Sequence, residues 1–130
     1  MTKEELRLLD ANLNRLREGI RVIEDIHRYI FNDKETSSKL KELRHQSRIE
    51  NYSQLLSSRD IKNDVLKKSN ESELKREDLS SILIANFKRA QESSRVLEEF
   101  GKLIDAQTSS TFKSIRYELY HLEKSIIKHA

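Results

Sequence analysis

The 130-residue sequence contains no proline, no cysteine and no tryptophan, and it has only two glycines. Proline and glycine are the two strongest helix breakers, so their near absence from a chain rich in Leu, Glu, Lys and Arg predicts a mostly helical protein. Without cysteine the chain has no disulfide, no thiolate zinc site and no thiol nucleophile. A chain of this length buries a core without such cross-links, so we expect one helical domain over residues 1–130.

Long apolar runs are also missing from the sequence. The first residues, MTKEELRLLD, have no apolar signal-peptide core, and no stretch approaches membrane-spanning length. We therefore expect a cytoplasmic protein without membrane association. The net charge of +3 suits a small anionic ligand, but acids are interleaved with the basic residues and no helical face is uniformly basic, which argues against nucleic-acid binding. Because no GxxxxGK[ST] motif is present, any phosphoryl transfer would occur without a Walker loop.

The most informative feature of the sequence is an internal repeat. Residues 11–25 read ANLNRLREGIRVIED, and residues 85–99, at an offset of 74, read ANFKRAQESSRVLEE. Repeated helices usually retain apolar packing positions, so a repeat that is mostly polar indicates side chains that face something specific. The identical pairs are Ala11/Ala85, Asn12/Asn86, Arg15/Arg89, Glu18/Glu92, Arg21/Arg95, Val22/Val96 and Glu24/Glu98.

The spacing of the apolar residues predicts four helices. They recur every three or four positions from Leu6 to Ile30, which predicts a first helix over residues 2–31. We expect a second helix to about residue 57, a polar loop over 58–77 with one short helical turn, a third helix over about 79–105, and a fourth from Ser109 or Ser110 to the C-terminus. Each helix has an apolar stripe, so the prediction is an all-α, antiparallel four-helix bundle. It would consist of two duplicated hairpins, 2–57 and 78–130, related by a pseudo-twofold axis.

Each repeat carries an asparagine and an arginine one turn apart beside its apolar stripe. These pairs are Asn12 with Arg15 and Asn86 with Arg89, and both border the core. A buried guanidinium without a partner costs several kcal/mol, so both pairs need one. Two interpretations stay open, namely interhelical bonds to acids on neighbouring helices, or a phosphate or carboxylate ligand held between the two pairs.

A second polar row lies further round each repeat helix. Its acids and arginine are spaced by three and four residues, which is typical of a solvated ion-pair ladder. The same acids would also suit Mg²⁺ held against a nucleotide, because a magnesium site needs only one or two carboxylates besides phosphate oxygens. The row consists of Glu18, Arg21 and Asp25 in the first repeat and of Glu92, Arg95 and Glu99 in the second.

The loop and the second helix add further candidates. Arg59, Asp60 and Asp64 lie in the loop motif RDIKND, either as ordinary solvated residues or as part of a lid over a pocket between the hairpins. His45 follows Arg44 on the second helix, where a lone histidine is usually a surface or structural residue.

Five segments of the chain, in this order, carry a resemblance to a known family: DANLNRLREGIRVIED (10–25), LKELRH (40–45), RDIKNDV (59–65), ANFKRAQESSRVLEEFGKL (85–103) and IRYELYHLEK (115–124). They resemble the small helical domain fused ahead of thiamine-phosphate synthase in some bacteria, which also occurs alone and is assigned as an alternative hydroxymethylpyrimidine-phosphate kinase. The resemblance implies thiamine biosynthesis, with ATP and Mg²⁺ converting a phosphorylated pyrimidine, hydroxymethylpyrimidine phosphate, to the diphosphate. The alternative is a non-catalytic partner or substrate-binding module of thiamine-phosphate synthase. The oligomeric state stays open, a homodimer included.

The resemblance also implies roles for individual residues and shows one departure. The family tends to read RDT followed by DVG, whereas this chain has Ile61 and Leu66 in place of the Thr and the Gly. That exchange removes a hydroxyl and a close backbone approach from the loop. The expected roles are catalysis by Arg15, Arg89, Asp60 and Asp64, substrate binding by Asn12, Asn86, Arg44, His45 and Arg59, nucleotide binding by Arg21 and Arg95, and metal binding by Asp64 and Glu18.

Overall fold

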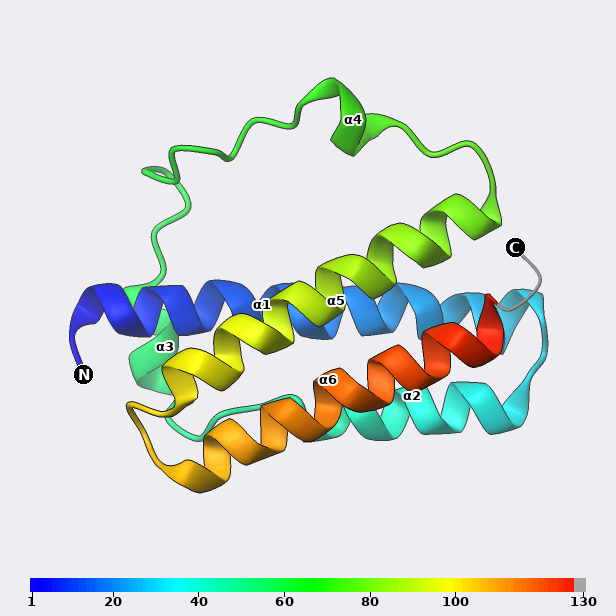
Figure 1. Cartoon of the computed structure of the whole chain (residues 1–130). Coiled ribbons are helices and arrows are strands. Elements are labelled where there is room, and N and C mark those ends of the chain that lie inside the picture. The colour runs from blue at the N-terminus through cyan, green and yellow to red at the C-terminus, as the bar shows by residue number, and fades with distance from the viewer. Residues whose placement is uncertain (128–130) are drawn as a thin grey trace.

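The computed structural model describes residues 1–127, and all regular elements in that range are helical. The predicted all-α class is therefore confirmed. None of the described helices is long and apolar enough to cross a membrane. The elements are α1 (Lys3–Asp25), a π-helical turn η1 (Ile26–Ile30), α2 (Lys34–Gln46), α3 (Tyr52–Ser58), α4 (Glu71–Leu74), α5 (Leu79–Gly101) and α6 (Ala106–Ile126) (Figure 1).

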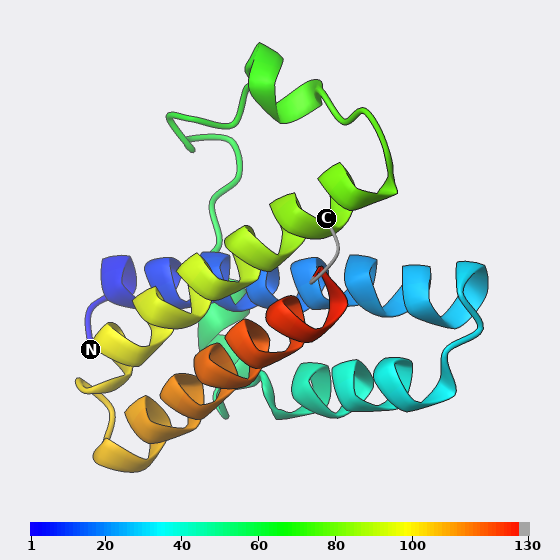
Figure 2. The same cartoon turned by 45° about the vertical axis from the view of Figure 1, so that its right-hand side comes forward.

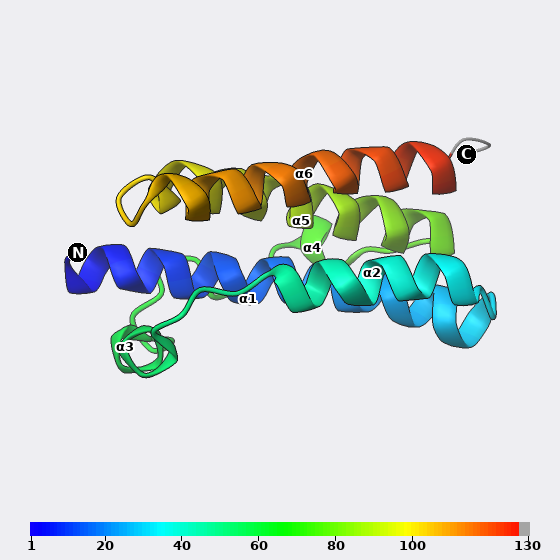
Figure 3. The same ribbon diagram turned by 90° about the horizontal axis from the view of Figure 1, so that it is seen from below.

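The helices form two layers that meet along α1 and α5. Within each layer, α2 packs against α1 and α6 packs against α5 (Figure 3). Helices α1 and α5 run in opposite directions and cross at the centre of the molecule, whereas α2 and α6 contact each other little (Figure 1). The seam between α1 and α5 therefore holds the two layers together.

The core confirms most of the predicted apolar stripes. Phe87 and Phe112 are fully buried between the layers together with the leucines and isoleucines of α1. The predicted third helix to about residue 105 is too long, because α5 ends at Gly101 and Ile104, in the following turn, is 37% exposed. The buried apolar residues of the long helices are Leu9, Leu13, Leu16, Ile20 and Ile23 of α1, Leu83, Phe87, Ala90 and Leu97 of α5, and Phe112, Ile115, Leu119 and Leu122 of α6.

Gly19 sets the distance between α1 and α5. An ideal Cβ placed on this glycine would lie 3.2 Å from the backbone oxygen of Asn86 and 3.5 Å from the Cβ of Ala90. Any side chain here would push against the backbone of the opposite helix, so glycine permits the close approach. The contact also defines the register in which the two repeat helices face each other.

The first hairpin differs from its prediction at both ends of α2. The first helix has the predicted extent, but its last turn is the π-helical η1, and Asn32 then reverses the chain with a φ of 52°. The predicted second helix to residue 57 is wrong as one helix, because α2 ends at Gln46 and α3 begins at Tyr52. The hydroxyl of the buried Ser47 donates to the Leu43 carbonyl, and such local bonds compete with helix continuation.

The break after α2 makes the two hairpins unequal, since α2 has 13 residues and α6 has 21. Helix α3 lies to the side of the α2 axis and packs on α1 (Figure 3). The closed four-helix bundle of two duplicated hairpins therefore stays a prediction. The fourth helix was expected to reach the C-terminus; α6 ends at Ile126, and residues 128–130 lie outside the described residues.

Aspartates cap three of the helices. The carboxylates of Asp33, Asp78 and Asp105 each accept a hydrogen bond from the backbone N–H three residues on, at 3.0, 2.8 and 2.7 Å. These bonds favour the charged carboxylate and lower the pKa of all three residues. Asp33, Asp78 and Asp105 are the N-caps of α2, α5 and α6, so the fourth helix begins before the predicted Ser109 or Ser110.

These caps predict an acid-dependent loss of stability. A carboxyl whose pKa is lower in the folded state than in the unfolded state stabilises the folded protein at a pH above the unfolded pKa of about 3.9. This contribution is lost as the pH falls through the lower pKa of the folded state. We expect the free energy of unfolding, measured by urea titration, to fall below about pH 4. The combined Asp33→Asn, Asp78→Asn and Asp105→Asn variant keeps three capping side chains that do not titrate, so its decline should be shallower. An unchanged pH dependence would contradict this role.

Candidate functional site

A groove of about 490 Å³ runs between α1 and α5, on the side where the loop between α3 and α5 arches over the molecule (Figures 1 and 2). Every α1 residue in its lining is matched at an offset of 74 by the α5 residue that also lines it. The repeated polar positions are therefore gathered in a single groove. The lining consists of Asn12, Arg15, Glu18, Gly19 and Val22 from α1, Asn86, Arg89, Glu92, Ser93 and Val96 from α5, and Leu66 and Glu73 from the loop.

The antiparallel register divides this groove into two half-sites. Gly19 lies against Asn86 and Ala90, so moving toward the N-terminus of α1 means moving toward the C-terminus of α5. The first half-site combines the Asn–Arg pair of α1 with the valine of α5, and the second combines the Asn–Arg pair of α5 with the valine of α1. The first half-site is Asn12, Arg15, Glu92 and Val96, and the second is Asn86, Arg89, Glu18 and Val22.

The two asparagines are held in the same way. The amide nitrogen of Asn12 donates to the Leu8 carbonyl at 3.0 Å, and that of Asn86 donates to the Ile82 carbonyl at 2.8 Å. Each bond fixes the rotamer of its side chain, and Asn12 is buried whereas Asn86 is half-buried. The amide oxygen and the second amide hydrogen are left for another partner, so each asparagine can both accept from and donate to a ligand.

Arg15 and Arg89 behave differently from most other arginines of the chain. Both are exposed in the groove, so the expected burial of their guanidinium groups is wrong, and neither makes a hydrogen bond or an ion pair with any residue of the described part of the chain. Glu18 and Glu92 lie in the same groove and likewise form no ion pair there within 1–127. The interhelical bonds that were one interpretation of the Asn–Arg pairs are therefore not present, and two guanidinium groups face a shared space.

Arg44, by contrast, is fully engaged with a buried acid. Its Nε and Nη2 donate to the two carboxylate oxygens of Glu24 at 2.7 and 3.2 Å, which raises the pKa of Arg44. The second repeat has the same arrangement, with Arg116 Nε at 3.0 Å from Glu98 Oε1. These pairs fasten α2 to α1 and α6 to α5, and Arg44 does not line the groove. His45 is an exposed residue of α2 and does not line it either.

The second polar row forms the ion-pair ladder in part. Arg21 pairs with Asp25 at 3.2 Å, and Arg95 pairs with Glu98 and Glu99 at 3.2 and 3.1 Å. Both arginine side chains are about half exposed, at 50% and 54%, so these pairs contribute little to stability. Neither Arg21 nor Arg95 lines the groove, and nucleotide binding by these two residues stays a prediction.

The loop residues of the RDIKND motif shape the loop and do not line the groove. Arg59 binds the buried Asp10 through two bonds of 2.8 and 2.9 Å, which raise the pKa of Arg59. The Asp60 carboxylate accepts from the side chain and backbone of Asn63, and these bonds lower its pKa. Asp64 accepts from the backbone N–H of Leu66 at 2.9 Å. The residues that the loop places in the groove are Leu66 and Glu73, and of these two only Leu66 had been noted in the sequence.

The described residues contain no group of three or more histidine or acidic side chains able to hold a metal ion. A bound Mg²⁺ would therefore depend on one or two carboxylates together with phosphate oxygens. Glu18 fits this requirement because it lies in the groove, and Glu92 offers the same from the other repeat. Asp64 lies outside the groove lining, so the structure places only one of the two expected metal ligands there.

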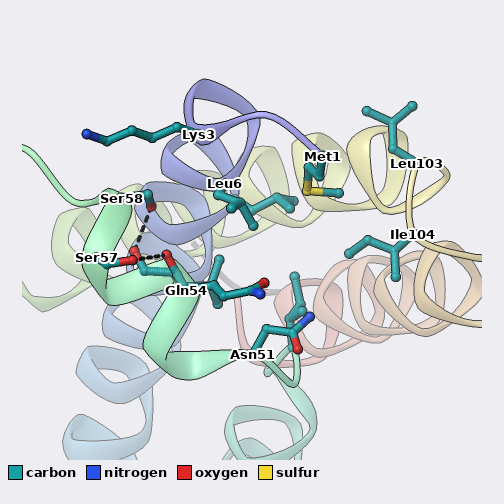
Figure 4. Close-up of a pocket in the computed structure, with 12 residues that line it drawn as sticks. Met1, Lys3, Leu6, Asn51, Gln54, Ser57, Ser58, Leu103 and Ile104 are labelled. Atoms are coloured by element: carbon teal, nitrogen blue, oxygen red, sulfur yellow. Dashed lines mark hydrogen bonds between the residues drawn. The ribbon is translucent and has the colours of Figure 1, made fainter.

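A larger cavity of about 760 Å³ lies at the end of the molecule near α3 (Figure 4). Met1, Leu6, Leu103 and Ile104 give it an apolar wall, and Lys3 is the one basic residue in its described lining. None of the repeated polar residues reaches it. The groove between α1 and α5 is therefore the better candidate for an anionic ligand.

The fold and the groove define a small all-α domain with a two-part, arginine-containing ligand groove. Residues 7–125 match the profile of the ThiD2 family, so the chain belongs to this family. No solved structure matches the chain significantly.

The chain is also similar to several thiamine-phosphate synthases. It is 41% identical over 121 residues to that of Thermosynechococcus vestitus, 42% over 120 residues to that of Rhodopirellula baltica, and 38% over 122 residues to that of Synechocystis sp.. These matches cover 92%, 88% and 93% of this chain but 34%, 32% and 36% of the relatives. The chain thus spans about one third of the length of the curated relatives it matches.

Proposed function

We propose that this chain is an ATP-dependent kinase of thiamine biosynthesis that phosphorylates hydroxymethylpyrimidine phosphate to the diphosphate. The observation that carries the proposal is the pair Arg15 and Arg89, two cations that face one groove and pair with no acid among residues 1–127. Guanidinium groups bind phosphate in a bidentate manner, and two of them suit a reaction that joins two phosphate-bearing molecules. Membership of the ThiD2 family and the similarity to thiamine-phosphate synthases support a role in thiamine biosynthesis.

Phosphoryl transfer depends mainly on positioning two phosphate-bearing molecules and on stabilising their charge. A groove with two similar half-sites supports this reaction because each half-site can position one of the two molecules. We propose two duplicated hairpins, each contributing one Asn–Arg pair, so that one half-site holds the substrate phosphate and the other holds the nucleotide phosphates. ATP would supply the transferred group, and Mg²⁺ would neutralise charge that two arginines cannot. Glu18, a groove carboxylate of the second half-site, would hold that ion, while Asp60 and Asp64 act by shaping the loop.

Turnover provides the direct test of this proposal. Purified protein with ATP, Mg²⁺ and hydroxymethylpyrimidine phosphate should form the pyrimidine diphosphate, detected by coupling to a thiamine-phosphate synthase. Glu18→Gln should remove most of the product because it weakens metal binding, and Asp64→Asn should lower it by loosening the turn before Leu66. Glu42→Gln on α2, outside the groove, is the matched control and should leave turnover unchanged.

A non-catalytic role is the second candidate, favoured by the similarity of the whole chain to one third of a thiamine-phosphate synthase. In that case the groove would bind the pyrimidine phosphate and deliver it to the synthase. Substrate binding without product, across several nucleotides and divalent metals, together with cosedimentation with a thiamine-phosphate synthase, would favour this role over the kinase.

A further inference from the structure

The loop between α3 and α5 is attached to the body of the molecule close to the first half-site. Arg59 is bonded to Asp10, and the Nη2 of Arg7 donates to the Asp60 carbonyl at 2.9 Å, so α1 holds the start of the loop at two points. From residue 61 to residue 69, the hydrogen bonds seen in the structure all join one loop residue to another. Leu66 follows this anchored start, whereas Glu73 lies near Asp78, where α5 begins.

The loop therefore adds a different residue to each end of the groove. Leu66 comes from the part of the loop held on α1 near Asp10, beside the half-site that begins at Asn12. Glu73 comes from the part that leads into α5, beside the half-site that begins at Asn86. The repeats make the two half-sites chemically alike, and the loop makes them unlike.

The first half-site has the chemistry of a site for a phosphorylated heteroaromatic ring. Leu66 forms part of the groove wall and yet is 83% exposed, so it has little packing of its own. A ring bound in the groove would be covered by Leu66 on one side and would meet Val96 on the other, which removes apolar surface from water. Asn12 then supplies one donor and one acceptor for ring nitrogens, and Arg15 supplies the cation for the phosphate.

The second half-site has the chemistry of a site for a magnesium-bound polyphosphate. Glu18 belongs to it and Glu73 enters the groove from the loop that leads into α5, and a Mg²⁺ site needs only one or two carboxylates besides phosphate oxygens. Gly19 replaces the serine found at the matched position 93, so this end of the groove lacks one side chain. Asn86 and Arg89 remain as ligands for phosphate oxygens.

From this asymmetry we infer that the first half-site, to which the loop adds Leu66, selects the pyrimidine phosphate, and that the second half-site, to which the loop adds Glu73, takes the nucleotide phosphates. The inference rests on the proposed function for the identity of the two ligands. It makes Leu66 and Asn12 the residues that determine substrate specificity.

Matched asparagine variants test the assignment without depending on turnover. In calorimetry with hydroxymethylpyrimidine phosphate alone, Asn12→Ala should weaken binding by about tenfold, as expected for a lost hydrogen bond of about 1.5 kcal/mol, and Asn86→Ala should leave it nearly unchanged. With Mg²⁺ and ATP alone, Asn86→Ala should weaken binding and Asn12→Ala should leave it nearly unchanged. Equal losses in both variants, or no binding of the pyrimidine phosphate, would overturn the assignment.

A fluorescent reporter gives a second readout that does not depend on the stability of the variants. Since the sequence has four tyrosines but no tryptophan, Leu66→Trp introduces a single tryptophan that can be excited selectively at long wavelength, and Leu103→Trp, outside the groove, serves as its control. Pyrimidine phosphate should shift the emission of the Leu66→Trp variant to shorter wavelength, and Mg²⁺ with ATP should not. If the unaltered protein shows no turnover while the variant shows this emission pattern, the kinase is refuted and the assignment is kept. If the unaltered protein turns over and the emission of the variant does not change, the assignment alone is refuted.

Discussion

Replacing Arg15 and Arg89 together by alanine is expected to abolish measurable binding of both hydroxymethylpyrimidine phosphate and ATP. Both guanidinium groups face the groove, where they are fixed on two packed helices. A charge-assisted hydrogen bond from such a group contributes about 1.5 to 3 kcal/mol. Arg15→Ala and Arg89→Ala should therefore each weaken the binding of the ligand in their own half-site by roughly 10- to 150-fold. Titration calorimetry measures the loss for each ligand separately.

Arg17 provides the matched control for this experiment. It is an exposed arginine of α1, close in sequence to Arg15, and it does not line the groove. Arg17→Ala should bind both ligands as the parent protein does, and circular dichroism of all variants should remain helical. Normal binding by the double variant together with a lower melting temperature would show that Arg15 and Arg89 serve the fold and have no part in binding.

Breaking the Glu24–Arg44 ion pair is expected to destabilise the protein more than any surface substitution. The side chain of Glu24 is 2% exposed and that of Arg44 is 14% exposed. Arg44→Met leaves the Glu24 carboxylate buried without its cation, and the loss of one partner from a buried pair costs about 3 to 5 kcal/mol. Urea titration should show this loss, and Arg116→Met should show a smaller one, because Glu98 keeps its pair with Arg95.

Two further variants separate the buried charge from the other contacts of Arg44. The combined Glu24→Leu and Arg44→Met variant removes both charges and should recover much of the lost stability, because the penalty comes from the charge that is left behind. Arg21→Met breaks an exposed pair and should cost about 0.2 to 1 kcal/mol. A loss below 1 kcal/mol in Arg44→Met would contradict this role. Ligand affinity of the folded Arg44→Met protein should be unchanged, since Arg44 lies outside the groove.

The sequence alone determined the helical class, most of the core stripes and the helical faces that carry the two Asn–Arg pairs of the groove, whereas it placed Glu18 and Glu92 in a separate row. Local periodicity is sufficient for this, because residues three and four apart share one face of a helix. The shared face of Asn12, Arg15, Gly19 and Val22, and that of the matched residues of α5, follows from spacing alone. Their position in one groove agrees with the interpretation that repeated polar residues face something specific.

Only the tertiary structure decided which of several similar arginines faces this groove. Arg15 and Arg44 look alike in the sequence, but Arg44 meets an acid 20 residues away on a neighbouring helix, and Arg15 meets none in the described range. The loop anchor joins Arg59 to Asp10, 49 residues apart, and no local pattern contains that contact. Local sequence patterns likewise do not contain the end of α2 at Gln46 or the position of Glu73 in the groove. Such features depend on how the helices pack and in which register, and the pattern within one helix carries no information about the distance to another.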